Sequence, residues 1–287
     1  MKRWLNGAMP SSLRPDPGRP PLNRQELERD LVGPETMWAA IDVVPSLEST
    51  NTELVARARR GAPAGTVLVA EHQTAGRGRL DRSFHTPARA ALTFSVLLRP
   101  TAPPRTYGWL PLLMGVAVVH AVQRTASVEA GLKWPNDVLA DGGKLAGILS
   151  EAAFGPAGAA VVIGTGLNVS QTREELPIDT ATSLALAGAA CTDRDTLLRE
   201  VLRAFAERYT RWAAHGGDAE AGGLAEEYRS CCTTLGQRVR VHLPGGGTLE
   251  GSAAGTDAEG RLLVRADDGR THPLTSGDVV HVRPVAP

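Results

Sequence analysis

Residues 132–169 read LKWPNDVLADGGKLAGILSEAAFGPAGAAVVIGTGLNV, and this stretch decides the fold expected for the chain. Two runs rich in strand-forming residues, 132–139 and 144–153, flank Asp141-Gly142-Gly143, a turn sequence typical of β-hairpins. A third run of apolar and β-branched residues covers 159–169. The stretch therefore predicts three consecutive strands, of which the first two form a hairpin.

The chain on either side of this stretch alternates between helix and strand signals. Asn23-Arg24-Gln25-Glu26 and Thr50-Asn51-Thr52-Glu53 both have the spacing of capping boxes at helix starts. Helices are predicted at 23–31, 50–60, 108–125, 193–213 (capped by Thr192) and 218–229, and strands at 39–44, 66–72 and 91–98. The mixture predicts an α/β (α+β) domain over residues 23–230. The Pro-rich residues 1–22 are expected to form a disordered tail.

The last part of the chain, 235–284, has a different pattern. Short β runs at 238–242, 262–264 and 279–282 are separated by Gly-rich or Asp-Gly turns. Short strands joined by such turns over this length predict a small SH3-like β-barrel.

The composition excludes several classes of protein. The 287 residues carry 31 Lys and Arg against 31 Asp and Glu, so no basic footprint for nucleic acid is expected. The three cysteines lack zinc or disulfide spacing, which favours reduced thiols. The longest apolar run, 110–122, is too short to span a bilayer, and no apolar segment follows the basic N-terminus. A cytoplasmic protein without a nucleic-acid or membrane partner is therefore expected.

Gly76-Arg77-Gly78-Arg79 is the first segment that could carry chemistry. It lies in 73–87, a stretch without periodicity that is expected to be a loop. Glycines let the backbone approach a ligand closely, and arginines add fixed positive charge suited to phosphate or carboxylate. The alternatives are a solvated turn or a Gly-Arg element that touches RNA.

Lysine is rare in this chain, since it occurs only as Lys2, Lys133 and Lys144 among the 31 cations. Lys133 lies in an apolar strand beside Trp134, where an ammonium is costly unless it meets an anion. The alternative is a lysine that reaches the surface along the tryptophan. Lys144 begins a strand interrupted by Gly147, which indicates either close approach of a ligand or a β-bulge.

Two more segments could contact a ligand through their backbone. Gly164 and Gly166 leave a strand bare, as a flat ligand would require, and Val169 stands where a dinucleotide fingerprint needs its third glycine. Residues 49–51 open a helix, for which capping is a sufficient explanation, although the same N–H groups can bind a ligand. The histidines show no metal spacing and no serine lies in a nucleophile elbow. Positioning and electrostatics are therefore favoured over covalent or zinc chemistry.

Together these segments resemble the biotin protein ligases (biotin–[acetyl-CoA-carboxylase] ligases), in the form without an N-terminal DNA-binding domain. The matching segments occur in the family's order: 49–51, 71–79, 133–137, 144–151 and 164–169, followed by 255–257 and 277–281 in the closing barrel. The resemblance implies a mixed-sheet, class II synthetase-like catalytic domain over 23–230 and an SH3-like barrel over 235–284.

The resemblance also implies an ATP-dependent ligation in two steps, with Mg²⁺ accompanying the phosphates. Biotin is first activated as biotinyl-5′-AMP and is then transferred to a lysine on the biotin carboxyl carrier domain of acetyl-CoA carboxylase or a related carboxylase. Lys133 and Arg79 are the implied catalytic residues, and no protein metal ligand is implied.

Further roles follow from the same resemblance, position by position. The implied biotin-binding residues are Ser49, Thr50, Asn51, Gln73, Gly76, Arg77, Gly78, Arg79, Lys133, Gly164 and Gly166. The implied ATP-binding residues are Arg79, Arg82, Lys133, Lys144 and Asn168.

Two positions depart from the family pattern, and two other functions compete. Asp81 stands where the family usually has Gly, and Phe84 stands where it usually has Trp. Asp81 could pre-pair an arginine, which leaves the role of Arg82 open. The competing functions are a lipoate or octanoate ligase or transferase of similar fold and a non-enzymatic Gly-Arg RNA-binding module. Because only a short N-terminal segment precedes the motifs, no operator binding is expected.

Overall fold

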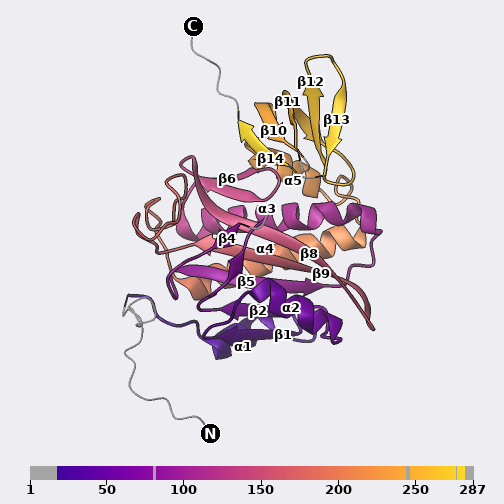
Figure 1. Cartoon of the computed structure of the whole chain (residues 1–287). Coiled ribbons are helices and arrows are strands. Elements are labelled where there is room, and N and C mark those ends of the chain that lie inside the picture. Colours follow the sequence, from indigo (N-terminus) through magenta and orange to yellow (C-terminus); the bar gives the residue numbers. More distant parts are fainter. Residues whose placement is uncertain (1–17, 80–81, 244–245, 276, 282–287) are drawn as a thin grey trace.

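The computed structural model describes residues 18–79, 82–243, 246–275 and 277–281, which build a large sheet with its helices and a smaller second sheet (Figure 1). The large sheet has seven strands in the order β1-β2-β5-β9-β8-β7-β6. These strands are β1 (Ala40–Val44), β2 (Thr66–Ala70), β5 (Ala91–Leu98), β6 (Ala130–Lys133), β7 (Asp137–Ala140), β8 (Gly143–Gly155) and β9 (Gly158–Asn168). β1 and β2 are parallel and the other neighbours are antiparallel, so the predicted mixed sheet is confirmed.

Both faces of this sheet are covered because its central strands are apolar at successive positions. In β2, Val67 and Val69 belong to the larger hydrophobic core, whereas Leu68 points to the other face and joins a smaller core. The larger core contains residues of α1 (Arg24–Leu31), α3 (Trp109–Ala126), α4 (Arg194–Ala214) and α5 (Leu224–Cys231). The smaller core is covered by α2 (Thr50–Arg59), whose N-terminus contributes to the candidate site.

One helical stretch among the described residues, Pro104–Ala126, is long and apolar enough to cross a membrane by composition. It consists of a short 3-10 helix (Pro104–Gly108) followed by α3. Within its most apolar window, 72% is buried inside the protein, which is the pattern of a core helix.

The hairpin predicted around residues 141–143 is confirmed as the β7–β8 turn. Asp141 and Gly142 have φ angles of 50° and 74°, as a two-residue type I′ turn requires. The single strand predicted over 132–139 is wrong. The chain reverses at Trp134–Asn136 and forms β6 and β7, with Lys133 opposite Asp137. Pro135 interrupts the run because it has no N–H to donate to a strand ladder.

Three other local predictions differ from the structure. The helix predicted at 218–229 begins only at Leu224, after Gly223, whose φ of 73° is left-handed. Asp193 rather than Thr192 caps α4, since its side chain accepts the Thr196 N–H at 2.7 Å. The loop predicted at 73–87 contains two short antiparallel strands, β3 (Gly76–Arg77) and β4 (Ser83–Phe84).

The second sheet is antiparallel, with the order β13-β12-β11-β10-β14. Its strands are β10 (Arg238–His242), β11 (Thr248–Thr256), β12 (Leu262–Ala266), β13 (Thr271–Leu274) and β14 (Asp278–His281). Two of these, β11 and β13, are missing from the sequence prediction because β11 is rich in small and polar residues and β13 contains Pro273. The fold class, a mixed-sheet domain followed by a small β module, is confirmed.

The second sheet is attached to the large domain near the β6–β7 turn (Figure 1). The Trp109 indole N–H donates to the Ala258 carbonyl at 3.1 Å, and the Trp134 backbone N–H donates to the Thr234 hydroxyl at 3.1 Å. The β11–β12 turn therefore contacts α3, and the segment before β10 supports the residue next to Lys133.

Residues 1–17 of the predicted tail lie outside the described residues. The rest of the predicted tail, 18–22, is bonded to the large domain. The Arg19 guanidinium pairs with Glu175, and the Leu22 N–H donates to the Glu71 carboxylate at 2.7 Å. The same carboxylate group pairs with Arg194 at 2.6 Å, and both side chains of that pair are less than a tenth exposed.

Candidate active site

The N-terminus of α2 forms a buried polar cluster with Gln73, which lies three residues after the end of β2. Ser49 caps the helix, and its hydroxyl accepts the Thr52 N–H at 3.4 Å. The Thr50 N–H and hydroxyl both donate to the Gln73 side-chain oxygen, at 2.7 and 3.0 Å. The structure thus brings Ser49, Thr50 and Gln73 together with their orientations set by hydrogen bonds.

Asn51 connects this cluster to the centre of the sheet. Its side-chain oxygen accepts the Ser95 hydroxyl at 2.8 Å, and its amide donates to the Leu149 carbonyl at 3.1 Å and to the Glu151 carboxylate at 2.9 Å. A Cβ on Gly164 would lie 2.3 Å from the Asn51 oxygen. Gly164 is therefore required by the close approach of Asn51, an explanation that the sequence did not indicate.

Gly166 lies two residues further along β9 and is covered by the ring of Phe84. A Cβ on Gly166 would lie 2.9–3.2 Å from three atoms of this ring. Phe84 belongs to β4, so the segment 73–87 folds back over the bare backbone of β9. The aromatic residue at the family's tryptophan position therefore lies directly against the strand predicted to line the biotin pocket.

Both arginines of the Gly-Arg segment contact neighbouring parts of the large sheet. Arg77 forms an ion pair with Glu151 at 3.1 Å, and the Arg79 guanidinium donates to the Asn136 side-chain oxygen at 3.2 Å. The Gly78 N–H donates to the Arg82 carbonyl at 2.6 Å, which closes the turn between β3 and β4. Asp81 lies outside the described residues.

The β6–β7 turn gathers the cations of the site. Lys133 is half-buried at the end of β6, opposite Asp137, and Asp137 pairs with the Lys144 ammonium at 2.6 Å. Asn136, between them in the chain, is the residue that Arg79 contacts. Three cations therefore meet at the β6–β7 turn, hereafter the cation corner: Lys133, Lys144 and Arg79. Arg79 lies far from the two lysines in the sequence.

Asn168 has a different environment from the one its predicted nucleotide contact suggests. Its amide donates to the Thr182 carbonyl at 2.9 Å, and its side-chain oxygen accepts the Gln171 amide at 2.9 Å. With only 6% of its surface exposed, Asn168 anchors the chain after β9 in this structure.

The titration behaviour of the site is simple. Burial lowers the pKa of His72, next to Gln73, so its imidazole is neutral at pH 7. At the end of α5, burial raises the pKa of the Cys231 thiol to about 12, which disfavours its thiolate form. Among the described residues no group of three or more His, Cys, Asp or Glu side chains could hold a metal ion.

Several residues of the site were missed by sequence reasoning. Glu151, Asn136 and Asp137 lie inside the quoted motifs, where each is a polar residue bordering an apolar strand. Ser95 is completely buried, and its only signal is that it and Thr93 are the two hydroxyl residues in a strand of apolar residues. Gln171 is also buried and carries no sequence signal of its own.

Comparison with known proteins agrees with this geometry. Residues 43–168 match the Biotin/lipoate A/B protein ligase family, and residues 234–282 match the Biotin protein ligase C terminal domain. A biotin–[acetyl-CoA-carboxylase] ligase of Mycobacterium tuberculosis is 46% identical over 270 residues, covering 92% of this chain and 97% of the relative.

Two further similarities extend the comparison. A bifunctional ligase/repressor of Escherichia coli is 30% identical over 90% of this chain and 77% of its own length. A solved structure of the biotin protein ligase from Aquifex aeolicus in complex with biotin and ATP superposes with a TM-score of 0.69 at 28% identity, covering 86% of this chain and 100% of that one. This chain belongs to the biotin protein ligase family.

Proposed function

We propose that this chain activates biotin with MgATP and transfers it to a lysine on the carrier domain of a biotin-dependent carboxylase, such as acetyl-CoA carboxylase. One observation carries the proposal. A buried neutral polar cluster at the N-terminus of α2 and a corner of three cations lie on the same sheet, connected by the Gly-Arg segment. A neutral ring system with a carboxylate tail fits the cluster, and phosphates fit the corner.

In the first step a biotin carboxylate oxygen attacks the α-phosphorus of ATP. The bond from the α-phosphorus to the bridging oxygen breaks, and pyrophosphate leaves. Negative charge grows on the phosphate oxygens, so Lys133 and Arg79, placed at the β6–β7 turn, stabilise this step. Arg82 and Lys144 are further candidates for phosphate contacts.

ATP is used as its magnesium complex, in which the phosphates, water and one or two protein carboxylates commonly hold the ion. At the cation corner, Asp137 is the carboxylate that would help to hold the ion beside the phosphates. When bound, the ion neutralises phosphate charge, and this chain's own residues orient the reactants.

In the second step the lysine amine of the carrier attacks the carbonyl carbon of biotinyl-5′-AMP, and AMP leaves. The nucleophile is the carrier's amine, so the proposed reaction needs no covalent intermediate on this chain. The mixed anhydride must be kept from water, and we assign that role to residues 73–87, hereafter the ligand loop. Gly76 and Gly78 allow its backbone to follow the ligand. A reaction that uses ATP and a carboxylase is expected in the cytoplasm.

The decisive experiment is biotin-dependent exchange of pyrophosphate into ATP, followed by avidin blotting of a carrier domain. Exchange that requires biotin, and a labelled carrier, are the expected results. Exchange with lipoate but not with biotin would instead assign the chain to the lipoate ligases, which the first family match also includes. RNA binding without either exchange would favour the Gly-Arg RNA-binding alternative.

A further inference from the structure

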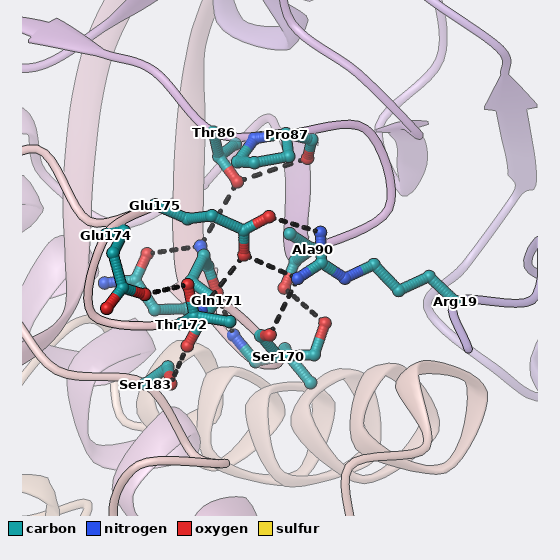
Figure 2. A network of polar contacts seen from close by, with 12 residues as sticks. Arg19, Thr86, Pro87, Ala90, Ser170, Gln171, Thr172, Glu174, Glu175 and Ser183 are labelled. Atoms are coloured by element: carbon teal, nitrogen blue, oxygen red, sulfur yellow. Dashed lines mark hydrogen bonds and ion pairs between the residues drawn. The ribbon is translucent and has the colours of Figure 1, made fainter. Parts of the chain in front are cut away.

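Gln171, which has no role in the proposed chemistry, forms the centre of a buried network (Figure 2). It is 1% exposed, and its amide donates both to the Thr86 hydroxyl at 3.2 Å and to the Asn168 side-chain oxygen at 2.9 Å. The side-chain oxygen of Gln171 accepts the Val169 N–H at 2.8 Å. The backbone carbonyl of Gln171 accepts the Ser183 hydroxyl at 2.7 Å. Every polar group of this side chain is therefore bonded, which fixes its position.

Thr86 is the point at which this network reaches the ligand loop. The upstream end of the loop is held by Gln73, through Thr50, and by the Thr74 N–H, which donates to the Leu47 carbonyl at 2.9 Å. At the downstream end, the Thr86 hydroxyl accepts from Gln171 and also lies 3.3 Å from the Pro87 carbonyl. Both ends of the loop are therefore tied to the body of the domain.

The two contacts between the loop and β9 follow each other in register. Phe84 covers Gly166. Two residues later in both segments, Thr86 is joined to Asn168 through Gln171. Because Thr86 follows Phe84 by only two residues, a fixed Thr86 limits how far the ring of Phe84 can shift along β9. A shift of the loop end would move this ring over the strand that we assign to the biotin pocket.

The segment that carries Gln171 is also held by contacts with Arg19, as Figure 2 shows. Arg19 makes two bonds to the Glu175 carboxylate, at 3.1 and 2.6 Å, and one to the Ser170 carbonyl at 2.9 Å. The Ser170 N–H donates to the Ala90 carbonyl at 2.9 Å. Arg19 thus connects the two ends of segment 170–175, and Ser170 joins that segment to Ala90, the residue before β5.

A cleft of about 450 Å³ lies between the parts that this network joins. Its lining includes His85, Thr86 and Pro87 from the loop end, 174–177 from the segment that Arg19 contacts, and Gln73 from the biotin side. The link through Gln171 therefore joins the chain segments on the two sides of an opening that borders the biotin cluster.

We infer that Gln171 and Thr86 are positioning residues, which hold the downstream end of the ligand loop so that it closes over biotin in one register. This inference rests on the proposed function. A loop whose two ends are fixed loses less conformational entropy when it orders on a ligand. Loss of the downstream anchor should therefore weaken biotin binding and let biotinyl-5′-AMP escape, while the phosphate chemistry itself changes little.

The test replaces Thr86 by valine, which keeps the shape and removes the hydroxyl, and by serine, which keeps the hydroxyl. For Thr86→Val we expect the KM for biotin in pyrophosphate exchange to rise about tenfold, as for a lost buried hydrogen bond. Its kcat should stay within about twofold. Free biotinyl-5′-AMP should appear in solution faster than with the unaltered protein, and Thr86→Ser should restore the KM.

A readout without catalysis accompanies this test, together with a matched control. Biotin should protect the loop arginines from trypsin in the unaltered protein and in Thr86→Ser, and less in Thr86→Val. Thr125→Val removes a comparable hydroxyl, which donates to the Ala121 carbonyl at 2.6 Å in α3, and should change neither readout.

The outcomes separate the two claims. If the unaltered protein shows no biotin-dependent exchange, the proposed function is wrong. If it does, and Thr86→Val keeps the biotin KM and tryptic protection of the unaltered protein, the positioning inference is wrong. A fall in active protein or in melting temperature with an unchanged KM would also overturn the inference, because it would show a merely structural role.

Discussion

The biotin side and the nucleotide side of the site satisfy their polar groups in opposite ways. On the biotin side, Thr50, Asn51, Gln73 and Ser95 are each less than a tenth exposed and bond to one another or to the backbone. On the nucleotide side the charged groups are more exposed, and the Lys144 side chain, paired with Asp137, is 34% exposed.

Under the proposed function, this difference matches the different chemistry of the two ligands. A neutral ligand gains affinity from donors and acceptors that are already oriented, because little ordering remains to be done on binding. Phosphates gain binding energy from cations that can exchange a weakly bound carboxylate for a more highly charged anion. In a partly exposed ion pair such as Lys144–Asp137, the carboxylate is a weak partner of this kind. Substitutions should therefore affect folding and biotin binding on the first side, and chemistry or ATP binding on the second.

The largest effect is expected for Lys133→Arg on the nucleotide side. The charge is conserved, but a planar guanidinium cannot place a compact positive charge where the ammonium lies at the end of β6. Biotin-dependent pyrophosphate exchange should fall by about 100-fold or more, as when a transition-state donor is lost. The melting temperature should change little. Near-normal exchange by this variant would contradict the role assigned to the ammonium.

Gly164→Ala should be next, and it tests the rigidity of the biotin side. The added Cβ would lie 2.3 Å from the Asn51 oxygen, so Asn51 must move and lose its bond to Ser95. The free energy of unfolding should fall by about 1–3 kcal/mol, and biotin affinity by calorimetry should fall about tenfold. Gly255→Ala is the matched control, since a Cβ there meets nothing within 4 Å. Equal behaviour of the two variants would mean that the cluster is not rigid.

Lys144→Ala should have a smaller and purely ligand-directed effect. Its ion pair with Asp137 is partly exposed, so the free energy of unfolding should change by less than about 1 kcal/mol. The KM for ATP should rise roughly five- to tenfold, as for a charged hydrogen bond, with the KM for biotin unchanged. Arg124→Ala removes a cation from an exposed pair with Glu200 and is the control. A rise in the biotin KM alone would reverse the assignment of the two sides.

The smallest effect is expected for the ion pair between Arg19 and Glu175. The Arg19 guanidinium lowers the pKa of Glu175, so the pair stabilises the folded state above the ordinary glutamate pKa of about 4.3. At pH 7, Arg19→Gln should unfold more easily by roughly 1 kcal/mol. This difference should begin to shrink as the pH falls below about 4.3 and should vanish below the lowered pKa of folded Glu175, where the carboxylate is protonated in both states. A difference that does not depend on pH would show that Arg19 stabilises the protein through contacts other than the Glu175 carboxylate, such as its bond to the Ser170 carbonyl.

Much of the molecule could be predicted from local sequence. The type I′ hairpin at Asp141-Gly142 followed from residues that tolerate positive φ. A helix start near residue 50 followed from the capping pattern, although the capping side chain is that of Ser49 and not that of Thr50, which the predicted capping box required. The split of 132–139 into two strands did not follow, because its strand-forming residues continue past Pro135 and only the pairing of Lys133 with Asp137 reveals the reversal. β11 was also not predicted, because its small residues give no strand pattern. Only its pairing with β10 and β12 in the second sheet identifies it as a strand.

The sequence alone determined the family, the two kinds of module and the residue types proposed to contact the ligands, because these depend on short motifs whose chemistry is local. Only the tertiary structure decided the partners. It placed Asn51 against Gly164, joined Arg77 to Glu151, and connected Thr86 through Gln171 to Asn168. Such contacts join residues far apart in the chain, and no local pattern records a contact that exists only after the sheet has formed.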